Sequence, residues 1–207
     1  MVCRGKHHAM TNLRRFGLLA PLAALSLAGC GLNSVPTAEE NVNAKWANVQ
    51  NQYQRRADLY GNLVATVQAA ANQERTVLRE VTEARAQAGS IRLTPEQLSD
   101  PEAVQRYADA QARLAPPVVF RQLQEAYPEL QANANFRDLQ AQIEGTENRI
   151  SIARQDYNEA VQSYNTTIRT FPDAIGAKII HGAKPKVPFE AVTPGAEVAP
   201  KINFNQQ

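Results

Sequence analysis

The chain has 207 residues, of which 22 are Lys or Arg, 20 are Asp or Glu, and 43% are hydrophobic. Its surplus of basic residues lies at the N-terminus, and the sequence after residue 29 has 18 basic and 20 acidic residues, a formal charge of −2. Since nucleic-acid-binding domains keep a basic surface, we exclude nucleic acid as an expected partner.

The first 29 residues have the pattern of a bacterial signal peptide. An apolar run from Phe16 to Leu27 follows the basic residues, and it is shorter than the roughly 20 residues that a membrane span needs. It ends in Leu27-Ala28-Gly29-Cys30, which resembles the lipobox of bacterial lipoproteins. We therefore predict cleavage before Cys30 and attachment of fatty acids such as palmitate to this residue, which would hold the protein on a membrane. An ordinary signal peptide or an uncleaved anchor is the alternative.

The residue after the lipidation site indicates the membrane. Gly31 stands there, in place of the aspartate that commonly retains lipoproteins in the inner membrane of bacteria with two membranes. If the source has two membranes, we expect the outer membrane, with the protein facing the periplasm.

The next residues, 30–37, are predicted to form a tether, and residues 38–171 a helical bundle. From Ala38 to Ala88 there is no proline and one glycine, and apolar residues recur about every 3.5 positions, as in helices that pack along a seam. This pattern predicts one very long first helix. Arg56 and Glu74 are charged positions within its apolar series.

The middle of the bundle contains a predicted helix break. Asp100-Pro101 has the residues of a helix start, with a capping carboxylate followed by proline in the first turn. The helix then meets Pro116-Pro117, where missing N–H groups and ring clashes must break or kink it. It resumes afterwards and ends before Pro128.

The last long helix is predicted to start at a cap formed by Asn133 or Asn135, and its apolar series runs from Phe136 to Phe171. Residues 172–207 are rich in proline and are expected to be an extended or partly disordered tail. The predicted fold class is therefore all-α, an up-and-down antiparallel bundle of about four helices.

Several segments resemble the LemA family of bacterial membrane-associated proteins. They are YQRRADLYGNLVATV (53–67), VTEARA (81–86), YPELQANANFRDLQ (127–140), TENRISIARQDYNEAVQSYNTTIRTFP (146–172) and, in the tail, PFEA (188–191) and APKINF (199–204). The resemblance implies a bundle of about four helices on an N-terminal membrane anchor, with no established enzymatic activity. Two positions depart from the family: Gly61 replaces a usual proline, and Pro116-Pro117 interrupts a usually smoother helix.

Charged and amide side chains lie near the seams of the first and last helices. An up-down-up arrangement would make these two helices parallel and could bring the polar groups together in the bundle. Such a cluster can mark a functional site, although a charge in a helix seam more often fixes register and partner choice. The candidate residues are Arg55, Arg56, Asp58, Glu74, Glu147 and Asn148.

The stretch DYNEAVQSYN (156–165) repeats Tyr-Asn at a seven-residue interval. On a helix this places Tyr157 and Tyr164 on one stripe and Asn158 and Asn165 on the next. One hypothesis is a polar-aromatic strip that binds a ligand. The other, which we favour, is that the tyrosine rings pack inward with their hydroxyls outward while the asparagines tie helices together.

Motifs of enzymes are absent from the sequence, which has no Gly-rich phosphate loop, HExxH, CxxC or GxSxG. A di-iron bundle needs paired ExxH motifs, and His181 is the one histidine that remains after the signal. We therefore expect no metal and no cofactor.

The expected function is that of a lipid-anchored envelope protein, a non-enzymatic scaffold or protein-interaction module. Its partners would be a membrane, through Cys30, and an envelope protein, and self-association into a homo-oligomer is also open. The tail sequence KVPFEAV (186–192) could add to a partner or fold back on the bundle. The alternative is an envelope enzyme, or an accessory subunit of one, that uses the polar cluster. A membrane-shaping role is not favoured, because no basic amphipathic face is evident.

Overall fold

The computed structural model describes the backbone of residues 9–70 and 76–190, and the side chains of residues 33–69 and 76–190. This part of the chain is helical and contains no strand, which confirms the all-α prediction. In chain order the elements are α1 (Ala9–Ala70), α2 (Thr76–Ser90), the 3₁₀ helix η1 (Glu96–Ser99), α3 (Pro101–Ala112), α4 (Pro116–Ala126), the 3₁₀ helix η2 (Pro128–Ala132), α5 (Ala134–Thr167) and α6 (Asp173–Ile179).

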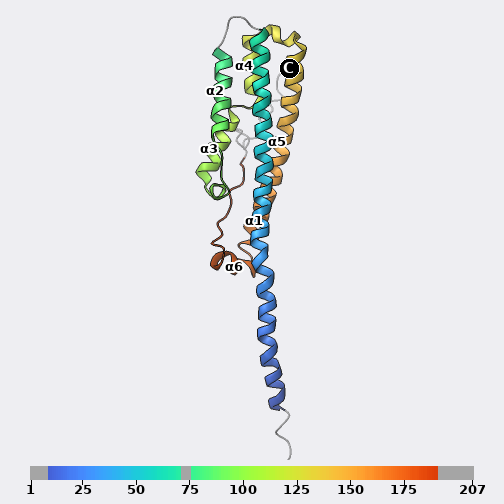
Figure 1. Ribbon diagram of the computed structural model, residues 1–207, viewed down its shortest axis with the longest axis vertical. Coiled ribbons are helices and arrows are strands. Elements are labelled where there is room, and N and C mark those ends of the chain that lie inside the picture. Colours follow the sequence, from blue (N-terminus) through green and yellow to red (C-terminus); the bar gives the residue numbers. More distant parts are fainter. Residues whose placement is uncertain (1–8, 71–75, 191–207) are drawn as a thin grey trace, which may run out of the picture.

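Helix α1 is the axis of the molecule, and α5 lies along it (Figure 1). The two helices are antiparallel, because Lys45 Nζ bonds Asp156 Oδ2 at 3.0 Å and Arg56 Nη1 bonds Glu147 Oε2 at 2.8 Å, so numbering rises on one helix as it falls on the other. The expected parallel course is therefore wrong. The chain turns back after α1, rises again through α3 and α4, and descends through α5.

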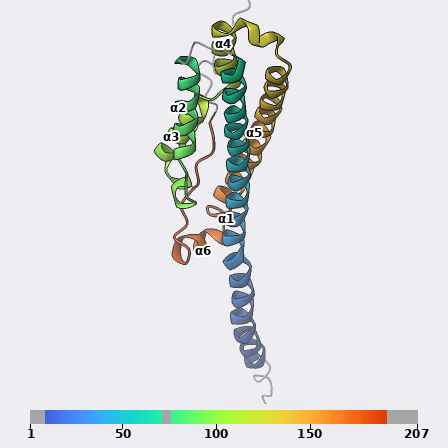
Figure 2. The same ribbon diagram turned by 45° about the horizontal axis from the view of Figure 1, so that its top comes forward.

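The single long helix predicted for residues 38–88 is also wrong, because two helices cover this range. Helix α2 runs back along α1 (Figure 2), and Arg85 Nε donates to the carbonyl of Ala57 at 2.7 Å. Leu63 of α1 and Leu78 of α2 pack into the same apolar cluster. Each helix thus has its own buried face. Because both faces have the same apolar spacing, the sequence pattern does not show where the chain reverses.

Residues 30–37, expected as a tether, belong to α1 in the structure. Val35 is buried in the core, and Ser34 Oγ donates to Asp173 Oδ1 at 2.8 Å. These contacts show that residues 34 and 35, ahead of the predicted start at residue 38, already pack on the bundle. The segment expected to be extended from residue 172 begins with the short helix α6, and the extended part follows it.

The predicted break in the middle of the bundle is present, since α3 ends at Ala112 and α4 starts at Pro116. Asp100 caps α3 by accepting from the N–H of Glu102 at 3.0 Å. Asn133 caps α5 by accepting from the N–H of Phe136 at 3.2 Å.

The choice between the two asparagines gives a stability test. Replacing Asn133 with alanine removes the acceptor for a helix N–H and should lower the free energy of unfolding by about 1 kcal/mol. Asn135 is exposed on α5, and Asn135→Ala should change the stability by less than about 0.5 kcal/mol. Urea denaturation of the two variants measures the difference, and equal losses would contradict the capping role.

Candidate functional site

Arg56, on α1, is the buried centre of the predicted polar cluster, and only 2% of its surface is exposed. Its Nη1 donates to Glu147 Oε2 at 2.8 Å across the α1–α5 interface. Its Nη2 donates to the backbone carbonyl of Gln111 at 2.8 Å and to the Gln111 side-chain oxygen at 3.0 Å. The guanidinium also lies 5.0 Å from the centre of the Tyr53 ring. The charge is therefore neutralised and hydrogen-bonded within the bundle.

This cluster lies where the middle helix is interrupted. The last carbonyls of a helix lack intrahelical partners and carry partial negative charge. Arg56 supplies a donor to the carbonyl of Gln111, and Tyr60, one turn along α1, donates to the carbonyl of Leu114 at 2.8 Å. Gln111 in turn donates to the carbonyl of Ala88 at 3.2 Å, at the end of α2. The cluster thus joins α1, α2, α3 and α5 at one level.

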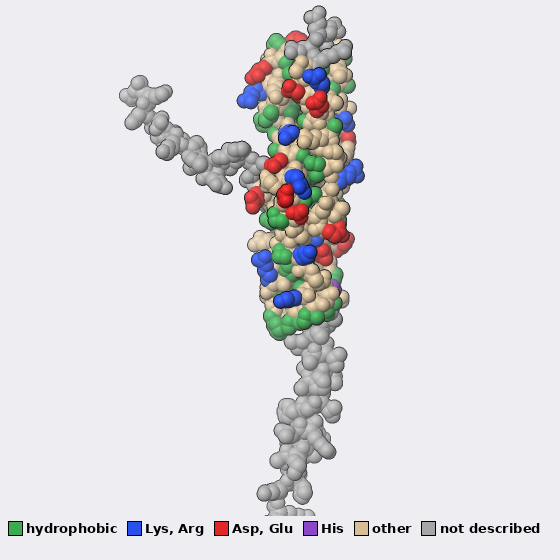
Figure 3. Space-filling model, turned by 90° about the vertical axis from the view of Figure 1, so that its left-hand side faces the viewer, with side chains coloured by type: hydrophobic (Ala, Val, Ile, Leu, Met, Phe, Trp, Pro, Cys, Tyr) green, Lys and Arg blue, Asp and Glu red, His purple; other side chains and the backbone are tan. Residues whose placement is uncertain are grey.

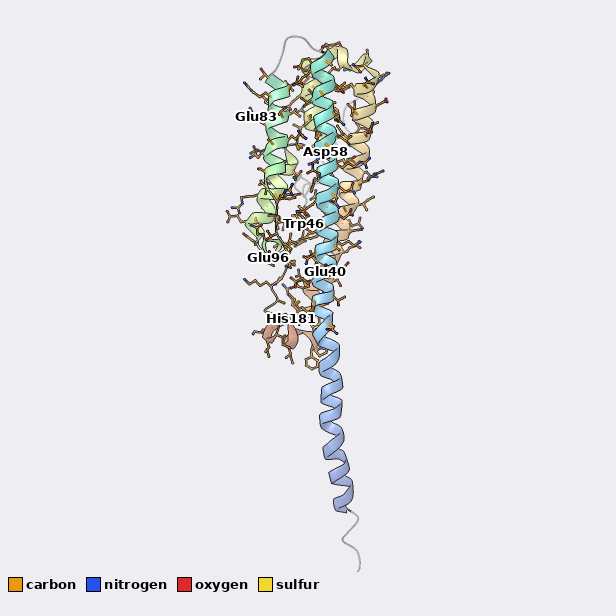
Figure 4. All side chains as sticks on the ribbon, in the orientation of Figure 1. Glu40, Trp46, Asp58, Glu83, Glu96 and His181 are labelled. Atoms are coloured by element: carbon orange, nitrogen blue, oxygen red, sulfur yellow. The ribbon has the colours of Figure 1, made fainter. Side chains whose placement is uncertain are left out.

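The other candidates for this cluster are not part of it. Arg55, Asp58 and Asn148 are exposed, and Asp58 accepts from Gln54 on its own helix. Figure 4 labels Asp58 on α1. Glu74 lies outside the described residues. Of the six candidates, the structure therefore brings together Arg56 and Glu147.

A cleft of about 490 Å³ borders the cluster on the side of α2 and α3. Tyr53 and Gln111 line both the cleft and the Arg56 site, and most of the remaining lining is amide or apolar. Burial, the largest cause, raises the pKa of Tyr53, so its hydroxyl stays protonated at neutral pH. Among the described residues, no group of three or more His, Cys, Asp or Glu side chains could hold a metal ion.

The Tyr-Asn strip of α5 binds the chain's own tail. Asn158 donates to the carbonyl of Phe189 at 2.9 Å and accepts from the N–H of Phe189 at 2.8 Å. Asn165 makes the same pair of bonds with Lys186, at 2.8 and 2.9 Å. Each amide side chain therefore replaces a neighbouring strand for one tail residue. We call residues 186–190 the strap.

The spacing of the two asparagines matches the strap. Seven residues of α-helix rise about 10.5 Å, and three extended residues, from Lys186 to Phe189, span about 10 Å. Tyr157 is buried, which raises the pKa of its hydroxyl, and this hydroxyl donates to the carbonyl of Val187 at 3.0 Å. The N–H of Val187 donates to the carbonyl of Leu98 in η1 at 2.8 Å. Pro188 has no N–H to satisfy.

Side chains of the strap are buried in the bundle. Lys186 is 5% exposed, and its Nζ bonds Glu39 Oε1 at 3.0 Å and the carbonyl of Pro95 at 2.8 Å. Phe189 stacks on Trp46 at 5.7 Å between ring centres and meets Tyr157 edge-on at 5.6 Å. Figure 4 labels Trp46 on α1.

Tyr164 completes the strip and is buried against the core. Burial, with a smaller contribution from the carboxylate of Glu39, raises the pKa of Tyr164 to about 12. The tyrosines thus pack inward as expected, while the asparagines bind the strap and not a neighbouring helix.

Comparison with known proteins shows the family of this chain. The family model of the LemA family matches residues 45–204. The chain belongs to the LemA family. It is 26% identical over 192 residues to the magnetosome proteins MamQ 1 and MamQ 2 of Paramagnetospirillum magneticum, and the match covers 82% of this chain and 67% of each relative. The resemblance found in the sequence is thereby confirmed.

The structure of this LemA-family chain contains no helix, among those described, that is long and apolar enough to cross a membrane. Cys30 lies in α1, and its side chain is outside the described set.

Three residues that matter in this LemA-family protein were not among the sequence candidates: Gln111, Lys186 and Phe189. Gln111 looks like any polar residue on a helix, and its role depends on the end of α3. The alternation in KVPFEAV (186–192) is consistent with burial of Phe189, but it gave no signal for the burial of Lys186. The sequence did not reveal that the strap binds to the Tyr-Asn strip on α5.

The asparagine bonds to the strap give a test by hydrogen exchange. Asn158→Ala removes the acceptor of the Phe189 N–H, and Asn165→Ala removes the acceptor of the Lys186 N–H. Since each net hydrogen bond contributes about 1 kcal/mol, we expect the amide that lost its acceptor to exchange about fivefold faster. The other amide of the pair is the internal control, and uniform acceleration throughout the bundle would contradict local binding.

Proposed function

We propose that this LemA-family protein is a lipid-anchored envelope protein whose bundle acts as a scaffold or protein-interaction module. The observation that carries the proposal is the strap in its groove. The bundle binds an extended peptide through paired main-chain hydrogen bonds and buries two of its side chains, Lys186 and Phe189. Extended peptides are recognised in the same way when they add to a protein surface.

The anchor follows from Cys30 and the pattern that precedes it. Acyl chains on Cys30 would restrict the bundle to a membrane surface and raise its effective concentration toward membrane partners. In a bacterium with two membranes, Gly31 favours the outer membrane, with the bundle in the periplasm. Membership of the LemA family supports association with a membrane.

The enzyme alternative has less support. A catalytic group needs access to a substrate and a protonation state that can change. Arg56 is enclosed, and its hydrogen bonds go to Glu147 and to the end of α3. These contacts give Arg56 and Glu147 a structural role, which is to hold the helices together, and no catalytic role is needed to explain their pairing.

The scaffold proposal can be tested by photo-crosslinking in intact cells. Photoreactive residues at Gln162 and Thr166, which line a cleft beside Pro188, should form adducts with the same envelope protein, identified by mass spectrometry. A photoreactive residue at Gln131, exposed in η2, is the control site. The adducts should disappear in Cys30→Ser. A missing adduct at both cleft positions, or identical adducts without the lipidation cysteine, would contradict the proposal.

A further inference from the structure

Exposed large hydrophobic side chains are concentrated at one end of the described bundle. Four of the six such residues in the described chain lie between Phe171 and Ile180. Figure 3 shows hydrophobic side chains gathered at the lower end of the coloured surface. They are Phe171, 71% exposed, Ile175, 55%, Ile179, 77%, and Ile180, 59%. We call these four residues the apolar tip.

Helix α6 points its large apolar side chains away from the protein. Ile175 and Ile179 are four residues apart and share one face. The opposite face holds Asp173, bonded to Ser34, and the small residue Ala177, which is buried. A helix that packs only on its own bundle would bury its larger apolar face. The outward face therefore requires another apolar environment.

The position of α6 indicates what that environment is. Ser34, which receives α6, comes one helical turn after Cys30 in the continuous helix α1, about 6 Å along the axis. Figure 1 shows α6 at the end of the bundle from which α1 continues toward Ala9, and His181, labelled in Figure 4, marks the same end. The apolar tip is thus next to the residue that would carry the lipid.

The charges around the tip suit an anionic surface. Arg169, Lys178 and Lys184 lie in or within four residues of the segment that holds the tip and are exposed. Asp173 is the sole acidic residue from 168 to 185, and its carboxylate is half-buried against Ser34. Exposed cations beside protruding apolar side chains are the composition of segments that lie in a membrane interface.

We propose that the apolar tip inserts into the headgroup region of an anionic bilayer beside the lipid anchor, as a second point of attachment that orients the bundle. This rests on the proposed anchoring at Cys30. The exposed cations come from α6 itself, which holds Lys178, and from the segments before and after it, which hold Arg169 and Lys184. The anchor alone would allow the bundle to pivot, and the second contact would fix which end faces the membrane.

The depth of the tip can be measured in the lipidated protein. An environment-sensitive fluorophore on Ile179→Cys should be quenched by spin-labelled lipids in phosphatidylglycerol–phosphatidylethanolamine vesicles. It should also be quenched by iodide at least about threefold less than the same label on Gln131→Cys. Equal iodide quenching at the two sites would overturn the proposal. Labelling of the unsubstituted protein would instead reveal a free thiol, at Cys30 or at Cys3 of an uncleaved N-terminus, and with it the failure of the anchor.

A second measurement removes the lipid. The mature chain with Cys30→Ser should float with anionic vesicles, and adding Phe171→Ser and Ile179→Ser should weaken binding about tenfold or more. Because these side chains are exposed, the circular dichroism spectrum should not change. Ile152→Ser, 54% exposed on α5, is the matched control and should bind as before.

The same experiment separates a membrane from a second copy of the chain. Binding should fall on zwitterionic vesicles and with Lys178→Glu, since anionic lipids attract each nearby cation. Unchanged vesicle binding by the double-serine variant would overturn the proposal. If the parent protein were a dimer and the double-serine variant a monomer, with equal vesicle binding, the proposal would also be overturned. The tip would then be a site of self-association.

Discussion

Replacing Arg56 with alanine is expected to lower the free energy of unfolding by about 3 kcal/mol, because removal of one partner from a buried ion pair leaves several groups unsatisfied. Glu147 loses its cation, and both oxygens of Gln111 lose the donor that Arg56 supplies. The packing of the guanidinium on the Tyr53 ring is lost as well. Urea denaturation of the mature chain measures the change.

The neighbouring residue supplies the control for this experiment. Arg55 is the same residue type on the same helix but is exposed, and Arg55→Ala should change the stability by less than about 0.5 kcal/mol. Glu147→Gln should cost less than Arg56→Ala, since Glu147 is 39% exposed at its side chain and the amide can still accept. A functional site without a structural role would give equal stabilities for the two arginine variants.

Replacing Phe189 with alanine is expected to release the strap. The side chain is 5% exposed and lies against Trp46, Tyr157 and the guanidinium of Arg154. Truncation of a buried phenylalanine to alanine costs about 3 kcal/mol of stability. Here the cost reduces the free energy that holds the short strap on the bundle. Trp46 is the one tryptophan in the chain, so its fluorescence should shift to longer wavelength when the ring that covers it is removed.

Proteolysis measures the same release. Trypsin cuts after lysine, and Lys186 is buried in the bound strap, so cleavage there requires the strap to leave the groove. A cost of about 3 kcal/mol should accelerate this cut on the order of a hundredfold. Phe171→Ala, on a side chain 71% exposed, should leave both signals unchanged. Unaltered fluorescence and cleavage in Phe189→Ala would show that the ring does not hold the strap.

The apolar period and the cap residues were sufficient to predict an all-α fold, the start of α3 and the break before α4. The reversal between α1 and α2 was missed for a physical reason. Residues 71–75 contain neither proline nor glycine, and antiparallel packing buries the faces of both helices as well as a continuous helix would. Local sequence does not distinguish these outcomes, because tertiary contacts decide between them.

The candidate site was predicted in part, for reasons that differ between its two regions. Arg56 was detectable because a charge inside an apolar seam must find a partner, and Glu147 lies in the facing helix. Asn158 and Asn165 were detectable as a repeat. Their ligand was not, because a match between a helical repeat and an extended segment depends on how the chain folds back.

The continuity of α1 has a mechanical consequence. From Cys30 to Ala70 it is one uninterrupted helix, about 60 Å long, and α5 braces it along much of this length. With the proposed anchor at Cys30, the pair would act as a spacer that sets the height of the η2 end above the membrane. Inserting one heptad into α1 alone would put every pairing with α5 beyond the insertion out of register, whereas inserting it into both helices would lengthen the reach by about 10 Å.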